Sequence, residues 1–154
     1  MPQRVREIAV ALTEAGLPTQ AVDSADDAIW TKLAMAGPMN PLGAVLRKTV
    51  AEVAGNPDSA ALVRGVFDEI VAVARATGVE LDADAVWAHA QETYGLSGAH
   101  YASMAADAIA GRRTEIDTHA GEVVRIGKEY GVPTPLNEML WRLVRAIEAG
   151  YPGG

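Results

Sequence analysis

The sequence predicts an all-α protein folded as a multi-helix bundle, and three features lead to this prediction. Apolar residues recur at intervals of three and four along most of the 154 residues, and no long segment alternates with the period of two that marks a half-buried strand. Glycine and proline fall between the periodic segments, where helices end. Apolar residues make up 49% of the chain and charged residues 21%, a composition typical of globular proteins.

Helix boundaries follow from capping residues, glycine and proline. Asn56 followed by Pro57 is an N-cap with proline at the first helical position, and Thr114 is a further N-cap candidate. Pro38 and Pro41 should break a helix between them, near residues 39–40. In chain order, helices are expected over 5–15, over about 25–36, from about 41, from 57 to the glycine at 78, from 82, over about 99–110, after 114 and from 134, with an extended stretch through 22 after the first.

Composition excludes several classes of protein. The net charge of −7 would repel nucleic-acid phosphates and anionic membrane surfaces, so no nucleic-acid or membrane partner is expected. The absence of cysteine excludes disulfides and thiolate sites, and the three histidines share no metal-ligand spacing, so no metal is expected. No export signal opens the chain, and no run approaches the roughly 20 apolar residues of a membrane span, so a cytoplasmic location is expected.

Lys32 is the most unusual residue of the second predicted helix. On a helical wheel Ile29, Leu33 and Ala36 form one apolar face, and Lys32 projects within it. A lysine in such a place commonly extends along apolar surface to reach water, and this is the favoured interpretation from the residues alone. Partial removal from water would instead make the ammonium a better proton donor, or its amine a nucleophile toward a carbonyl. Both interpretations stay open.

Four other residues have a structural and a functional interpretation. Glu115 lies in the first turn after Thr114, where an acidic side chain favours the helix N-terminus, but it could also act as the base that complements a lysine. Arg112 could bind a substrate carboxylate, or simply lie at a solvated helix end. Asn40 between prolines is typical of a turn, and Ser103 on a helix is typically bonded to local backbone.

Several motifs together resemble the ketopantoate reductase family. The segment 30–42, with its lysine and its later Asn-Pro-Leu, resembles the family's signature helix. The other matching segments are Ser103-Met104, Asp107, Gly111-Arg112, Thr114–Asp117 and Gly131–Asn137. The resemblance covers residues 16–148 and implies the helical C-terminal domain of that family. We therefore expect one helical domain over 1–154, in which 1–22 resembles the tail of the family's nucleotide domain and 23–149 its C-terminal domain.

The resemblance also implies roles for individual residues. In the family, a lysine acts as general acid on the keto oxygen, while asparagines, a serine and a glutamate position ketopantoate and the cofactor. The matching residues here are Lys32 and Glu115 as catalytic candidates and Asn40 and Ser103 as substrate-binding candidates.

Two departures and one missing motif limit this resemblance. Ala36 and Val50 stand where the family has asparagines. We therefore expect these two residues to contact a substrate that is less polar than ketopantoate. The family's N-terminal half is a Rossmann domain that binds NADPH, and this chain has no Gly-x-Gly-x-x-Gly after a strand. No cofactor is therefore expected, unless a separate Rossmann subunit supplies NADPH.

Three functions remain open from the sequence. The favoured one is a cofactor-independent acid/base enzyme that isomerises, eliminates or cyclises a small carbonyl compound, with Lys32 as proton donor. The second is the substrate-binding half of a split NADPH-dependent 2-oxo acid reductase. The third is a non-catalytic module for ligand binding or assembly. A homodimer is expected, because the surface that packs against a nucleotide domain in the family would be apolar and uncovered here.

Overall fold

The structure of the chain, a computed structural model, describes residues 1–151 and confirms the all-α prediction. Within these residues the ordered elements are helices, and none is a strand. They are α1 (Gln3–Glu14), α2 (Asp26–Ala36), α3 (Met39–Leu46), α4 (Val50–Gly55), α5 (Pro57–Ala76), α6 (Ala83–Leu96), α7 (Ser103–Ile109), the π-helical turn η1 (Asp117–Gly121), α8 (Glu122–Tyr130) and α9 (Pro135–Glu148). No helix of the described part is long and apolar enough to cross a membrane.

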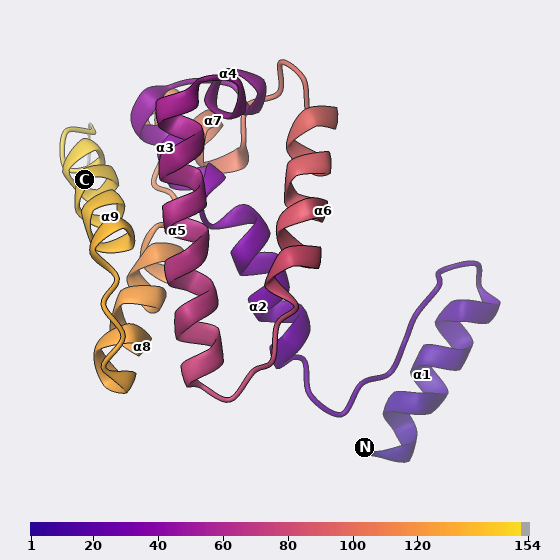
Figure 1. Cartoon of the computed structure of the whole chain (residues 1–154). Helices are drawn as coiled ribbons and strands as arrows, with labels where there is room; N and C mark the ends of the chain where they lie inside the picture. Colours follow the sequence, from indigo (N-terminus) through magenta and orange to yellow (C-terminus); the bar gives the residue numbers. More distant parts are fainter. Residues whose placement is uncertain (152–154) are drawn as a thin grey trace.

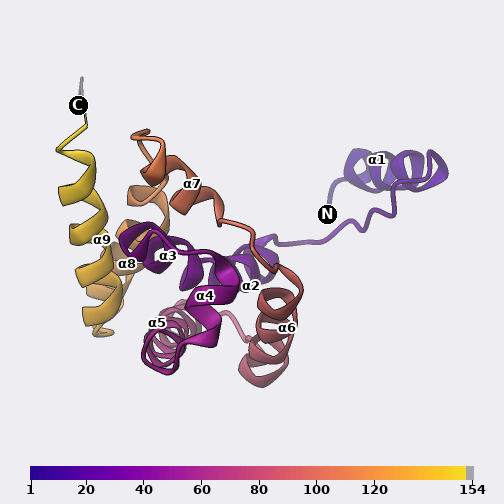
Figure 2. The same ribbon diagram turned by 90° about the horizontal axis from the view of Figure 1, so that it is seen from above.

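Helix α5 forms the centre of a bundle (Figures 1 and 2). It packs against α2 and α4, and also against α8 and α9, while α6 packs against α2 and α3 packs against α7. Helix α1 lies away from the bundle at the end of an extended segment, residues 17–22 (Figure 1). The bundle therefore begins at α2, and α1 forms a separate arm.

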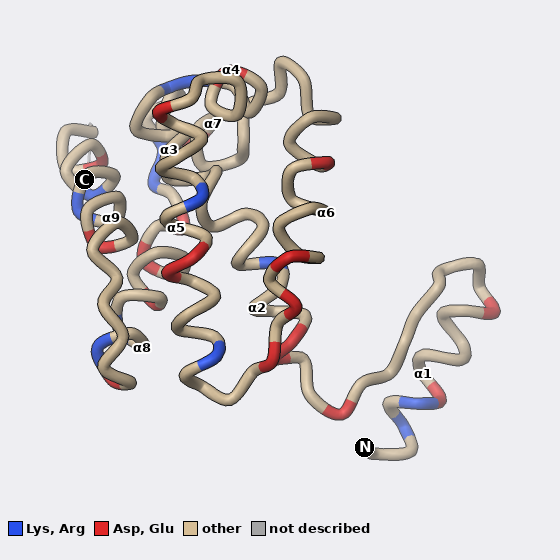
Figure 3. Tube along the Cα trace, in the orientation of Figure 1, with Lys and Arg blue, Asp and Glu red and all other residues tan. Residues whose placement is uncertain are grey.

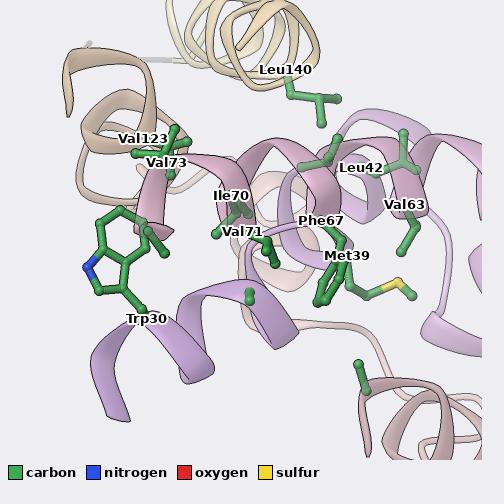
Figure 4. Close-up of a cluster of buried hydrophobic side chains, with 14 of the residues drawn as sticks. Trp30, Met39, Leu42, Val63, Phe67, Ile70, Val71, Val73, Val123 and Leu140 are labelled. Atoms are coloured by element: carbon green, nitrogen blue, oxygen red, sulfur yellow. The ribbon is translucent and has the colours of Figure 1, made fainter. Parts of the chain in front are cut away.

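The core surrounds the inward face of α5, whose apolar residues recur at helical spacing: Val63, Val66, Phe67, Ile70 and Ala74 (Figure 4). Phe67 and Ile70 have no exposed surface, and the Phe67 ring packs on Trp87 with ring centroids 4.9 Å apart. The other fully buried large side chains come from α4, α5, α7, α8, α9 and the segment before η1: Val53, Val66, Val73, Met104, Ile116, Val123, Val124, Leu140, Val144 and Asn137.

The break between α2 and α3 falls slightly earlier than predicted. Gly37 and Pro38 form the turn, and α3 already begins at Met39. Pro41 is tolerated because it lies in the first turn of α3, where backbone N–H groups have no intrahelical partner. A Cβ on Gly37 would lie 2.5 Å from the carbonyl oxygen of Leu33 and 2.8 Å from the Cδ1 atom of Ile70, so a side chain here would require the backbone to shift.

The helix predicted after Thr114 begins as a π-helical turn. The N–H of Gly121 bonds the carbonyl of Ile116, five residues back, at 3.1 Å. Trp141 of α9 packs on this turn, and its Nε1–H donates to Asp117 at 2.6 Å. A Cβ on Gly121 would lie 3.1 Å from that nitrogen, so the wider turn and its glycine together make room for the indole.

The sequence also predicts a loop at Gly95 and an apolar stripe on the last helix that includes Met139, Leu140, Leu143 and Val144, and the structure differs in both. Gly95 lies inside α6, which continues to Leu96. On α9, Leu140 and Val144 are buried as expected, but Met139 and Leu143 are 43% and 41% exposed. The buried stripe of α9 is therefore narrower than its apolar spacing indicated.

Candidate functional site

A cleft of about 780 Å³ lies between α2 and α6 and continues to the start of α7. Its size is within the range of small-molecule sites. The lining residues are Asp27, Ala28, Thr31, Lys32, Met35, Ala36, Met39, Asn40, Val50, His89, Thr93, Tyr94, Ser97, His100, Ala102 and Ser103.

One wall of the cleft comes from a single face of α2 and its continuation into α3. Lys32, Ala36 and Asn40 follow one another at intervals of four residues, and all three line the cleft despite the turn between the helices. The expectation that Lys32 shares a buried apolar face with Ile29 was wrong, because Ile29 is 58% exposed and α2 buries Trp30 instead. Lys32 therefore points into the cleft from the side of α2 opposite the core.

The far end of the cleft is fixed by backbone hydrogen bonds. The N–H of Val50, the first residue of α4, donates to the carbonyl of His100 at 2.9 Å, and the N–H of Ala51 donates to that of Gly98 at 3.2 Å. These bonds keep residues 97–102 as a loop, which explains why α7 begins at Ser103 and not near 99. Val50, His100 and Ser103 are thereby brought to the same end of the cleft.

Lys32 carries the positive charge of the cleft. Among the lining residues of the described chain, Lys32 is the only lysine or arginine, and Asp27 is the only acid. Figure 3 shows a basic position on α2 and a group of acidic positions at the starts of α2 and α6. The Lys32 side chain is exposed, and an ammonium in this position can donate to a carboxylate or keto oxygen.

Glu115 does not line the cleft, although its charge acts near Lys32. Burial lowers the pKa of His119 on η1, the Glu115 carboxylate raises that pKa, and the Lys32 ammonium lowers it further. Both charges therefore lie within electrostatic reach of the same imidazole. The Nδ1 atom of His119 is buried and has no hydrogen-bond partner. A catalytic role for Glu115 stays a prediction.

Arg112 lies outside the cleft. Its guanidinium bonds the Asp107 carboxylate, with Nη2 at 2.6 Å and Nε at 2.8 Å from Oδ1. A substrate carboxylate would have to compete with this ion pair, so the structure gives no support to substrate binding by Arg112.

Polar residues of α6 line the cleft and were not identified from the sequence. His89, Thr93 and Ser97 follow one another at intervals of four, so they share one helix face opposite Lys32. This four-residue spacing is visible in the sequence and could have identified the three polar residues as one face. Nothing in the sequence pointed to Tyr94 as a residue of the cleft, because an aromatic residue on a helix is typically part of the core. Here its hydroxyl donates to the backbone carbonyl of Met35 and ties α6 to α2.

Comparisons with known proteins agree on one family. The family described as "Ketopantoate reductase PanE/ApbA C terminal" matches residues 24–148. A 2-dehydropantoate 2-reductase of Archaeoglobus fulgidus is 32% identical over 143 residues, which cover 93% of this chain and 48% of that protein. The chain thus spans about half the length of this relative.

Solved structures show the same fold. A ketopantoate reductase from Ralstonia eutropha JMP134 superposes with a TM-score of 0.88 at 32% identity, over 96% of this chain and 49% of that one. A D-mandelate dehydrogenase, in a ternary structure with NADH and anilino(oxo)acetate, superposes with a TM-score of 0.87 at 34% identity, over 95% of this chain and 61% of that one.

Proposed function

The chain belongs to the ketopantoate reductase family, as its C-terminal domain, and from this premise we propose that it is the substrate-binding half of a nicotinamide-dependent 2-oxo acid reductase. The observation that carries the proposal is the cleft in which Lys32, Asn40 and Ser103 meet. In this role Lys32 donates a proton to the keto oxygen, and Asn40 and Ser103 hold the substrate by hydrogen bonds.

The apolar residues beside Lys32 favour a substrate with an apolar substituent. Ala36 follows Lys32 by one helical turn, and Val50 faces the cleft from the start of α4. A polar group held against these side chains would lose hydrogen bonds to water without replacing them. The D-mandelate dehydrogenase structure contains anilino(oxo)acetate, an oxo acid derivative whose anilino group is largely apolar, and this supports the proposal.

The hydride must come from a nucleotide-binding domain outside these 154 residues. The chain has no Gly-x-Gly-x-x-Gly motif, so its own residues do not fit a dinucleotide, and we derive no step through one. This chain contributes the pocket, the orientation of the keto group and the proton. NADPH supplied by a separate Rossmann subunit stays the proposed arrangement.

Cofactor-independent acid/base chemistry finds no support in the comparisons, but it can be tested. Incubation of the chain alone with 4-methyl-2-oxopentanoate in D₂O would reveal it as deuterium uptake at the carbon beside the keto group. The proposal of a reductase half predicts no uptake above the uncatalysed rate. Uptake that disappears in Lys32→Met would favour the acid/base enzyme instead.

A homodimer also stays a prediction. Ile8, Val10 and Leu17 in and after α1 are 57%, 55% and 60% exposed, so this arm presents apolar side chains to solvent. A second copy could cover them. Sedimentation as a monomer at tens of micromolar would contradict this prediction.

Ligand binding tests the proposed function directly. Isothermal titration should show that 4-methyl-2-oxopentanoate binds more tightly than 4-methylpentanoate, which lacks the keto oxygen. Lys32→Met should weaken binding about tenfold or more, because a hydrogen bond to a charged group contributes about 1.5–3 kcal/mol. The matched control is Lys128→Met, an exposed lysine of α8 that lies outside the cleft. Equal affinities for wild type and Lys32→Met would contradict the proposal.

A further inference from the structure

A second pocket adjoins the cleft. Its volume is about 370 Å³, and it lies between α4, α5 and α6 and opens to solvent. Apart from Gln91, the hydroxyl of Tyr94 and the indole N–H of Trp87, the side-chain groups around it are apolar. The lining residues are Met39, Ala51, Ala54, Gly55, Ala60, Val63, Trp87, Gln91, Tyr94 and Gly95. A cavity of roughly 150 Å³ with such a lining can hold a benzene molecule, so this pocket is large enough for a phenyl group or a short alkyl chain.

Met39 and Tyr94 line both the cleft and the second pocket. They therefore form the partition between the two. Tyr94 is held in place by its hydrogen bond to the carbonyl of Met35, so its ring is the fixed part of the partition. Met39 is only 3% exposed, and its unbranched thioether side chain is of the kind that adapts to irregular space in a core. Figure 4 shows it beside Phe67, with its sulfur end toward Val63, which lines the second pocket.

We propose that the two pockets form one bipartite substrate site, in which the apolar substituent of a 2-oxo acid passes Met39 and occupies the second pocket. The inference rests on the proposed function, because it assumes that the oxo acid group binds at Lys32. It names the substrate class more closely: 2-oxo acids with a linear alkyl chain of several carbons or with an aryl-alkyl chain. Met39 is then the residue that determines specificity for chain length.

The structure favours this occupant over water or a separate molecule. The side chains around the pocket offer water few hydrogen-bond partners, so an apolar group that covers them gains from removing their surface from water. Its shared wall with the cleft means that one molecule can reach both. A substituent that enters the pocket leaves the cleft around Lys32 free for the carboxylate and keto oxygens.

Chain length provides the test. Burial of one methylene changes affinity about fourfold, so 2-oxooctanoate should bind the whole chain about fifteenfold more tightly than 2-oxohexanoate. Ala51 is an exposed residue that lines only the second pocket, and Ala51→Phe would fill it. This variant should reduce the fifteenfold preference to less than threefold and leave the affinity for pyruvate unchanged. Ala88→Phe, on the exposed face of α6 outside both pockets, is the control and should keep the preference.

A second variant tests the partition itself. Met39→Ala should raise the affinity for 2-oxooctanoate relative to that for pyruvate. Circular dichroism checks that this variant folds. If Met39→Ala does not fold, Ala51→Phe supplies the test. If pyruvate binds but 2-oxooctanoate binds no more tightly, or if Ala51→Phe keeps the full preference, the bipartite site is overturned and the proposed function stands. If no 2-oxo acid binds, both fail.

Discussion

Glu69 joins the middle of α5 to the start of α9, and its replacement should cost more stability than that of any exposed acid. Its Oε1 accepts the N–H of Leu136 at 2.8 Å, and its Oε2 accepts the N–H of Asn137 at 2.9 Å and the side-chain amide of Asn137 at 2.7 Å. The first turn of α9 has no side-chain cap of its own, since Thr134 makes no capping bond. The carboxylate therefore takes the place of the missing N-cap.

The size of the effect follows from these three bonds. A hydrogen bond to a charged group contributes about 1.5–3 kcal/mol net, but three bonds on one half-buried carboxylate do not add fully, and water can replace part of them. Glu69→Ala should therefore lower the free energy of unfolding by about 3 kcal/mol. For a protein of this size each kcal/mol shifts Tm by about 2–4 °C, so a decrease of roughly 6–12 °C is expected.

Urea unfolding at pH 7 measures this effect, with two comparison variants. Glu69→Gln keeps one acceptor oxygen but turns its NH₂ group toward a backbone N–H. It should therefore lower the free energy of unfolding less than Glu69→Ala and more than Asp68→Asn. Asp68→Asn changes the neighbouring exposed acid, which pairs with Arg64 at 2.9 Å, and should cost about 0.5 kcal/mol or less. If Glu69→Ala costs no more than Asp68→Asn, the idea that Glu69 caps α9 is wrong.

Two further predictions concern α5 and η1. Asn56 accepts the N–H groups of Asp58 and Ser59 at 3.1 Å each, so Asn56→Ala should cost about 1 kcal/mol in urea unfolding and Asn56→Asp much less. Burial lowers the pKa of His119, so the unfolded chain takes up the proton first as pH falls. This contribution to stability is complete above the unfolded pKa of about 6.5 and is lost as pH falls from there toward the folded pKa. Wild type should therefore lose more stability than His119→Gln between pH 7 and pH 5, and parallel losses in the two proteins would contradict this.

Helical spacing was sufficient to predict the bundle, whereas Lys32 and Asn40 were expected to line a substrate pocket from the family resemblance. Lys32 and Asn40 are eight residues apart, and this interval survives the turn at Gly37 because that turn advances the chain nearly as a helix would, with φ −57° and ψ −36° at Gly37. Which face of α2 is buried could not be predicted from the sequence alone. The sequence offers Ile29 and Trp30 as alternative core residues, and only the packing against α5 selects Trp30.

Features that depend on distant parts of the chain could not be read from the sequence. The far end of the cleft forms because Val50 bonds His100, fifty residues later, and Tyr94, which lines both pockets, is held by its bond to Met35, 59 residues earlier. Neither contact leaves a periodic pattern in the local sequence.

The central claim is that a 2-oxo acid binds beside Lys32, and the lysine side chains themselves can report it. The chain has only three lysines, at positions 32, 48 and 128, so reductive ¹³C-dimethylation gives three lysine NMR signals besides that of the N-terminus. The Lys32→Met variant identifies the signal of Lys32. Titration with 4-methyl-2-oxopentanoate should shift that signal to saturation and leave those of Lys48 and Lys128 in place. An unmoved Lys32 signal, or equal shifts at all three lysines, would contradict the account.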